Sequence, residues 1–240
     1  MLVEVCANSL ESALVAERAG AHRIELCAEL AVGGITPSYG LLKSVLDKVS
    51  LPVHVLIRPR SGDFTYSDAE LDSMLEDIAC CLDLGAAGIV SGILYKDFSL
   101  DVKRTGRLIN ATKNLKFTFH RAFDWIRDPL NALTELENLG VDTILTSGQQ
   151  SSAEEGISLL KELKKKASSL EIMPGSGINS ANALLFKEAG FGAIHLSGTR
   201  MIKQLDVQPR VEMNSYRLLS DDHVPITQYD TINGVVNKVK

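Results

Sequence analysis

Two short stretches near the start of the chain each place a carboxylate and a thiol two residues apart. VEVCA holds Glu4 and Cys6, and RIELC holds Glu25 and Cys27. Residues two apart on an extended strand point to the same face, so each stretch presents its acid and its thiol together. Thiolates are soft ligands that select Cu(I), whereas carboxylates in an enclosed site can move protons. The spacing therefore indicates either a metal site or a proton-transfer site.

Two later segments carry side chains suited to acid–base chemistry and anion recognition. TFHRAFDW places His120 at the end of an apolar run, where a histidine can act as an acid, a base or a metal ligand. IRPRSGDF places Arg58 and Arg60 in a similar position, and guanidinium groups bind carboxylates and phosphates through paired hydrogen bonds. The alternatives are a core histidine with satisfied hydrogen bonds and a loop salt bridge from an arginine to Asp63.

Glycine-rich turns provide a third kind of candidate. PGSGIN and LSGT contain Gly175, Gly177 and Gly198 directly after two predicted strands. Without a Cβ atom, such residues let backbone amides approach an anion closely. The alternative is an ordinary tight turn between a strand and a helix.

These residues must be positioned by the elements around them, and short β-branched runs alternate with longer amphipathic ones along the chain. The predicted strands begin near residues 2, 23, 53, 88, 116, 142, 171 and 193. A helix is predicted over 68–84, where Ser67 and Glu70 form a capping box in front of an apolar stripe. Strand–helix alternation of this kind is typical of α/β proteins with parallel sheets.

Eight such units favour a (β/α)8 TIM barrel, whose usual size is about 250 residues. An open doubly wound sheet is disfavoured because CANSLES, after the first strand, lacks the GxGxxG fingerprint. We expect the barrel to span 1–198. The remaining segment, 199–240, is predicted to be a short C-terminal extension with a last helix near 229–239, packed on the barrel or at a dimer contact.

Strand periodicity then predicts which residues face the lumen of the barrel. The apolar parity should face the helices: Val3, Val5, Ile24, Leu26, Phe117, Phe119, Ile194 and Leu196. The opposite parity should face inward: Glu4, Cys6, Glu25, Cys27, His54, Arg58, Thr118, His120, His195 and Ser197. Barrel active sites lie at the carboxyl ends of the strands, which is where both thiols are expected, and the loops after strands seven and eight are the usual phosphate site.

The inward residues also have simpler interpretations. Glu4, Glu25 and Arg58 could form a buried ion-pair network that only fills the lumen, and Cys6 and Cys27 could be small buried hydrophobic residues. His54 begins its strand at the bottom face, where a role in stability is favoured. No lysine lies at an inward strand end, which disfavours a Schiff-base aldolase.

Composition excludes several classes of partner. The 240-residue chain has a net charge of −5 and no long basic run, which disfavours nucleic acid and anionic membranes. The N-terminus has no signal-peptide pattern, and no apolar run reaches the length of a membrane span. The four cysteines form no CxxC motif or disulfide framework, so we expect a reduced, cytoplasmic protein with no organic cofactor.

Five segments, RIELC, GGITPSYG, IRPRSGDFTYS, TFHRAFD and ILTSG, occur in an order that resembles the CutC family of copper homeostasis proteins. The resemblance covers roughly residues 1–198, and the MPGSG loop and the tail differ from the family. It implies a barrel fold, a cytoplasmic location, a homodimer or higher homo-oligomer and a link to copper tolerance. It also implies a Cu(I) site at the thiols of Cys6 and Cys27.

Two functional hypotheses result. In the first, Cys6 and Cys27 bind Cu(I), with His120 or His195 as a third ligand; the nearby carboxylates oppose this by raising the pKa values of the thiols. In the second, the barrel is an isomerase or lyase acting on a small phosphorylated or carboxylated metabolite. A former enzyme retained as a binding scaffold is a third possibility.

The enzyme hypothesis assigns a role to each inward polar group. Glu25 or Glu4 is the base, His120 is its acid partner and Arg58 is the anion clamp. Arg60 and the glycine turns would help to bind the anionic group of the substrate.

Overall fold

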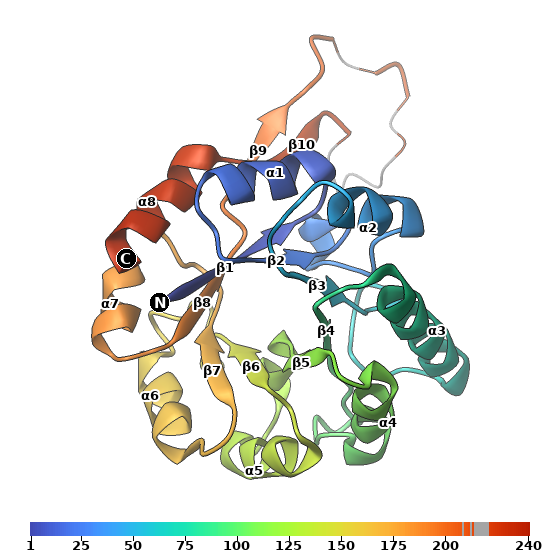
Figure 1. Ribbon diagram of the computed structural model, residues 1–240, viewed down its shortest axis with the longest axis vertical. Helices are drawn as coiled ribbons and strands as arrows, with labels where there is room; N and C mark the ends of the chain where they lie inside the picture. Colours follow the sequence, from blue (N-terminus) through green and yellow to red (C-terminus); the bar gives the residue numbers. More distant parts are fainter. Residues whose placement is uncertain (208, 212, 214–220) are drawn as a thin grey trace.

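In the computed structural model, which describes residues 1–207, 209–211, 213 and 221–240, eight short parallel strands form the wall of a barrel (Figure 1). The strands are β1 (Leu2–Ala7), β2 (Arg23–Leu26), β3 (Val53–Leu56), β4 (Gly88–Ser91), β5 (Lys116–Phe119), β6 (Thr143–Thr146), β7 (Glu171–Pro174) and β8 (Ala193–Leu196). Each strand pairs with the next in the order β7-β6-β5-β4-β3-β2-β1-β8. A single parallel bridge between Gly175 and His195 joins β7 to β8.

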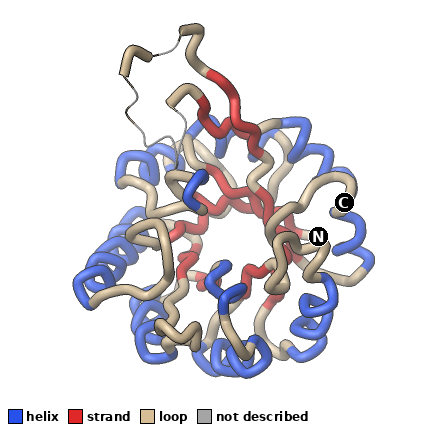
Figure 2. Tube along the Cα trace, turned by 180° about the vertical axis from the view of Figure 1, so that it is seen from behind, coloured by secondary structure: helices blue, strands red, loops and turns tan. Residues whose placement is uncertain are grey.

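A ring of helices surrounds the strands, as Figure 2 shows from behind. The helices are α1 (Leu10–Arg18), α2 (Tyr39–Leu46), α3 (Asp68–Leu84), α4 (Val102–Thr112), α5 (Pro129–Leu139), α6 (Ile157–Lys166), α7 (Ala183–Glu188) and α8 (Tyr229–Val239). Two short 3-10 helices, η1 (Leu30–Val32) and η2 (Arg121–Trp125), lie in loops. The predicted (β/α)8 barrel is confirmed, and none of the helices in the described part of the chain is long and apolar enough to cross a membrane.

Helix α3 shows how local sequence fixes an element of the barrel. The side chain of Ser67 accepts a hydrogen bond from the backbone N–H of Glu70, and the Glu70 side chain accepts one from the N–H of Ser67. This capping box satisfies N–H groups that the first helical turn leaves without partners. The helix ends at Gly85, whose φ of 82° is the left-handed conformation that glycine adopts most readily. The prediction of a helix over 68–84 is confirmed.

The C-terminal segment contributes to the barrel. After β8 the chain forms a projecting antiparallel hairpin of β9 (Thr199–Lys203) and β10 (His223–Thr227), and it then returns as α8 (Figure 1). Helix α8 packs against α7, α1 and β1 and buries one apolar face. It therefore supplies the eighth helix of the ring, and the barrel extends beyond residue 198. Positions 208, 212 and 214–220 of the predicted extension lie outside the described residues.

Alternation along the strands separates two layers of packing. The eight residues predicted to face the helices all belong to one large core cluster between the strands and the helices. Residues of the opposite parity form two smaller buried clusters: Cys6, Cys27, Leu56 and Val90 in one, and Leu145, Met173 and Ala193 in the other. The lumen is thus packed with side chains, and polar residues occupy the positions between these clusters.

His54 illustrates how tightly the lumen is filled. It is buried beside Gly88 on the neighbouring strand, and a Cβ atom on Gly88 would lie 2.7 Å from three atoms of the imidazole ring. Burial lowers the pKa of His54 to about 4, so the ring is neutral at pH 7. Glycine at position 88 is therefore required by close packing.

We predict that Gly88→Ala destabilises the protein by about 1–3 kcal/mol, the usual cost of overpacking a filled core. Gly40→Ala is the control, because Gly40 lies in α2 with nothing within 4 Å of an added Cβ atom. That change should stabilise the helix by up to about 1 kcal/mol. Urea unfolding measures both, and a Gly88→Ala protein as stable as the wild type would contradict this packing.

Candidate functional site

The candidate residues meet at the carboxyl ends of the strands, around a cavity of about 440 Å³. The residues that line it include Cys6, Glu25, Arg58, Phe64, His120 and His195. They come from β1, β2 and β8 and from the segments that follow β3 and β5. A larger hollow of about 730 Å³ lies between α1 and the β9–β10 hairpin and contains none of the predicted site residues.

Glu4 lies beneath the cavity and is fully buried. Its Oε2 atom accepts a hydrogen bond from Arg23 Nε at 2.5 Å, and its Oε1 atom is 2.8 Å from His195 Nδ1. Burial alone would raise the pKa of Glu4, but the hydrogen bond and charge of His195, together with Arg23, lower it to about 2. Glu4 is therefore ionised throughout the neutral range and anchors the guanidinium of Arg23 and the imidazole of His195 in the barrel.

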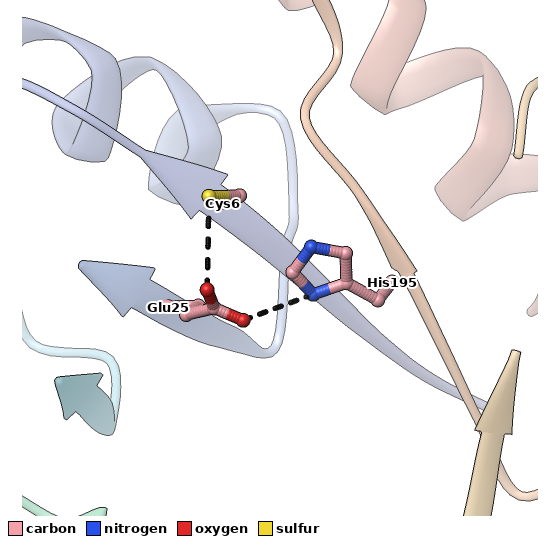
Figure 3. Close-up of side chains that lie close together, drawn as sticks. All are labelled: Cys6, Glu25 and His195. Carbon is pink, nitrogen blue, oxygen red and sulfur yellow. Dashed lines mark hydrogen bonds and ion pairs between the residues drawn. The ribbon is translucent and has the colours of Figure 1, made fainter. Parts of the chain in front are cut away.

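Glu25 has the opposite tendency although it lies on the neighbouring strand. Its carboxylate is 3.5 Å from His195 Nδ1 and 3.9 Å from Cys6 Sγ (Figure 3). Burial raises the pKa of Glu25 to about 7, against the lowering effect of His195. Two carboxyl groups with pKa values driven apart by their surroundings are typical of acid–base sites. Glu25, rather than Glu4, is the carboxyl group that can exchange a proton near pH 7.

His195 links the two carboxyl groups. Burial would lower the pKa of its imidazole, but the charges of Glu25 and Glu4 raise it above the ordinary value. Only 13% of the side chain is exposed. The imidazole thus serves as a shared partner of both acids at the edge of the cavity.

The two thiols, which strand parity predicted to face inward, are in contact with each other. Cys6 Sγ and Cys27 Sγ are 3.3 Å apart, both side chains are buried, and Leu56 and Val90 pack around them. The hydrogen bond with Cys27, burial and the negative charge of Glu25 raise the pKa of Cys6. Cys6 lines the cavity, whereas Cys27 is completely buried behind it. The pair therefore presents one sulfur atom, that of Cys6, to the cavity, and the ionisation of this thiol is opposed by its surroundings.

One group of potential metal ligands emerges from the described residues at this position. A sulfur of Cys6, an oxygen of Glu25 and a nitrogen of His195 all lie within 4.8 Å of one another (Figure 3). Cys27 adds a second sulfur in contact with the first. Soft sulfur and imidazole donors suit Cu(I) and Zn²⁺ better than hard cations, so this donor set fits the metal that the sequence predicts.

His120 is a neutral ring at the cavity wall. Its Nδ1 atom accepts a hydrogen bond from the backbone N–H of Ala122 at 3.2 Å, which leaves the ring proton on Nε2. Burial and the charge of Arg58 lower the pKa of His120 to about 3. His120 can therefore donate a hydrogen bond to a ligand, but it does not carry the extra proton that the predicted acid partner would need at pH 7.

Most of the guanidinium of Arg58 is used by the protein itself. Nη1 donates hydrogen bonds to the carbonyl oxygens of Val32 and Gly34, and Nη2 donates one to that of Gly62. The group stacks on the Phe64 ring, with 5.0 Å between Cζ and the ring centroid. Nε has no hydrogen-bond partner among the described residues. Arg58 thus connects two loops through its Nη atoms. Only its Nε–H group is left for a ligand, so the predicted two-point binding of an anion is not available.

The other residues predicted to bind an anion, Arg60 and the three glycines, differ in their position relative to the cavity. Arg60 pairs with Glu70 at 2.6 Å and with Asp63 at 3.2 Å, and it does not line the cavity. Its guanidinium is therefore committed to a loop salt bridge. Gly177 and Gly198 line the cavity, both with positive φ. Gly175 lies beside β8, at the bridge to His195. The anion-binding role of these turns stays a prediction.

Sequence reasoning missed two residues that shape the site. Arg23 shares the inward parity of Glu25, so the same alternation could have identified it as the partner of Glu4. Phe64 stacks on Arg58 and lies 4.9 Å from the His120 ring, centroid to centroid. It lies in the loop after β3, where no periodic pattern indicates which side chains turn inward.

Comparisons with known proteins agree on one family. The CutC family model matches residues 1–200. Family protein CutC of Enterobacter sp. (strain 638) is 50% identical over 196 residues, which are 82% of this chain and 79% of that protein. Family protein CutC of Pasteurella multocida (strain Pm70) is 50% identical over 200 residues, 82% of each chain. A Streptococcus agalactiae structure that bears the name copper homeostasis protein CutC is 37% identical, with a TM-score of 0.77, covering 81% of this chain and 97% of that one.

Because the pKa of Glu25 is raised in the folded protein, the free energy of unfolding should depend on pH. The pKa is about 7 in the folded protein against an ordinary value of 4.5. The contribution of this group to stability is thus fully present below the ordinary pKa and is lost as the pH rises through the folded pKa. Relative to Glu25→Gln, the unfolding free energy of the wild type should fall with rising pH, by up to about 1.4 kcal/mol per pH unit between about 5 and 7.

Urea unfolding at a series of pH values measures this difference. Glu76→Gln, at an exposed position on α3, is the control for the general effect of removing one carboxylate from the surface. A Glu25→Gln difference that is constant over this window would contradict a pKa near 7.

Proposed function

The chain belongs to the CutC family, and we propose that it takes part in copper homeostasis by binding Cu(I) at Cys6 and Cys27. The observation that carries this proposal is the 3.3 Å contact between the two buried sulfur atoms at the mouth of the barrel. Thiolates are the side chains that most strongly select Cu(I) over harder cations. The Streptococcus agalactiae relative is named for copper homeostasis, which agrees with this assignment.

The surroundings of the thiols suit a monovalent soft ion. Leu56, Val90 and Leu30 pack around the sulfur atoms and limit the access of water. A copper ion would enter from the cavity, where Cys6 is accessible, and displace the protons of both thiols. Because burial and the charge of Glu25 raise the pKa of Cys6, copper affinity should increase with pH.

His195 is the preferred third ligand. It lies within the same ligand group as Cys6 and Glu25, whereas His120 does not belong to that group. Its present bond to Glu4 would orient the imidazole, as carboxylate partners orient metal-bound histidines. We further propose that the protein works in the reducing cytoplasm, where such thiols stay unpaired, and as a homo-oligomer, as the family resemblance implies.

An anaerobic Cu(I) titration against a competing chromophoric chelator tests the thiol site. We expect one tightly bound equivalent in the wild type, and its loss in the double variant Cys6→Ser, Cys27→Ser. Cys80→Ser is the control, because Cys80 lies on α3 outside the cavity, and it should bind copper like the wild type. Equal affinity in the double variant would refute the thiol site.

A second candidate function, proton transfer by a barrel enzyme, is favoured by Glu25 and His120. Both line the cavity, one as a carboxyl group with a pKa of about 7 and the other as a neutral hydrogen-bond donor. Glu25 would take a proton from a carbon next to a carbonyl group, while His120 Nε2–H stabilises the enolate oxygen. Return of this proton to the former carbonyl carbon, while the hydroxyl proton of the neighbouring carbon passes to the enolate oxygen, completes the isomerisation of a hydroxy-carbonyl compound with no net change in atoms or electrons.

Exchange with solvent deuterium tests this second function. The metal-free protein is incubated in D₂O with small sugar phosphates and 2-oxo acids, and proton NMR follows the C–H groups next to their carbonyls. Enzyme-dependent exchange that Glu25→Gln abolishes is the expected result. No exchange with any member of the panel would count against the enzyme, and it would leave copper binding unaffected.

A further inference from the structure

Three residues of one cavity each carry a buried polar atom that makes no hydrogen bond. Within the part of the chain that the structure describes, Arg58 Nε and His120 Nε2 have no hydrogen-bond partner, and Glu25 Oε2 has only its 3.5 Å ion-pair contact with His195 Nδ1. Each parent residue is at most 6% exposed, and each lines the mouth cavity. Buried polar atoms are nearly always satisfied in folded proteins, because leaving one unpaired costs about 1–3 kcal/mol. Three such atoms around one cavity indicate a ligand that supplies the missing partners.

The chemistry of the three atoms restricts that ligand. Arg58 Nε–H and His120 Nε2–H are both donors, since His120 Nδ1 already accepts from Ala122. Both therefore require acceptor oxygens, and the positive charge of Arg58 favours an anionic one. Glu25 Oε2 is an acceptor when ionised, and a donor such as a hydroxyl group would be its partner.

A metal ion does not meet these requirements. A cation would be repelled by the guanidinium of Arg58, and an N–H group cannot act as its ligand. Copper at Cys6 and Cys27 would thus leave Arg58 Nε and His120 Nε2 unsatisfied. These two atoms need an occupant other than the proposed copper.

An aromatic wall completes this half of the cavity. Phe64 contacts the guanidinium of Arg58 and the ring of His120, and its ring centroid lies 4.9 Å from that of Trp125. These packed rings fix the two donors relative to each other. Phe64, which lines the cavity, also provides an apolar surface for a short carbon skeleton.

We propose that the mouth cavity binds a small hydroxylated organic anion, with its charged oxygens at Arg58 Nε and His120 Nε2 and a hydroxyl group at Glu25. The proposal rests on the second candidate function, to which it gives a ligand class, and it is independent of copper binding. Carboxylates and phosphate esters share the anionic oxygens that the two donors require. Ser176 and Gly177 line the same cavity in left-handed conformations, which places backbone close to the ligand.

Isothermal titration calorimetry on the full-length, reduced and metal-free protein tests the proposal. The probes are D-glycerate, glycerol 3-phosphate and glycerol. Glycerol carries the hydroxyl groups without a charge, so it should bind much more weakly than at least one of the two anions. Binding of glycerate alone identifies a carboxylate ligand, and binding of glycerol phosphate alone identifies a phosphate ester. No binding of either anion above that of glycerol would overturn the proposal.

His120→Asn is the most direct variant. The asparagine side chain can keep the acceptor for the N–H of Ala122 and lacks the second ring nitrogen, so anion affinity should fall about tenfold or more. His22→Asn is the matched control, because His22 Nδ1 also accepts a backbone hydrogen bond, from Val3, and His22 lies outside the cavity. It should bind the anion like the wild type. An unchanged affinity in His120→Asn would overturn the proposal.

Two further measurements cover a His120→Asn variant that does not fold and separate anion binding from copper binding. If His120→Asn does not fold, ¹⁵N NMR of the wild type shows whether the Nε2 resonance of His120 moves on anion binding while those of His22 do not; an unmoved resonance contradicts the site. Copper binding is measured with the Cys6→Ser, Cys27→Ser variant, and anion binding is measured with His120→Asn in the metal-free protein. Failure of copper binding and failure of anion binding are thereby observed separately.

Discussion

The burial of an ionised Glu4 in the lumen is the constraint on which the rest of the site depends. A buried carboxylate without partners costs several kcal/mol, and here Arg23 from β2 and His195 from β8 compensate for it. Both are register neighbours of Glu4 on adjacent strands. The network therefore joins β8, β1 and β2 at the place where the parallel sheet closes into a barrel, and it fixes the floor of the cavity.

The second carboxyl group, Glu25, cannot ionise easily, mainly because it is buried and to a smaller extent because Glu4 is already ionised. These effects outweigh the charge of His195 and raise the pKa of Glu25 to about 7. Its charge also opposes ionisation of Cys6. The resting site thus holds one fixed negative charge on Glu4, a carboxyl group of Glu25 that titrates near pH 7, and the thiol of Cys6, whose ionisation is opposed. This arrangement supports both proposals, since a soft cation can replace thiol protons and an organic ligand can exchange a proton with Glu25.

Strand alternation predicted the barrel and the inward position of the acids, thiols and histidines, because a period of two is fixed by backbone geometry. The contact between Cys6 and Cys27 needed the strand register, which alternation does not determine. The sequence did not decide between anion binding and salt bridges for the two arginines, because their partners depend on loop conformation. Arg60 pairs with Glu70 and Asp63, and two nitrogen atoms of Arg58 donate hydrogen bonds to backbone carbonyl groups. The last helix was predicted near 229–239, but the sequence did not decide between packing on the barrel and a dimer contact, because a hairpin separates this helix from β8.

X-ray absorption at the copper edge of the Cu(I)-loaded, reduced protein tests the central claim most directly, because it identifies the atoms bound to the metal. The 3.3 Å contact between the sulfur atoms of Cys6 and Cys27 predicts two sulfur ligands, and the position of His195 predicts one additional nitrogen. A spectrum with two sulfur scatterers would establish the paired thiols as the copper site. A spectrum with one sulfur or none would contradict it and leave the cavity as a site for organic anions.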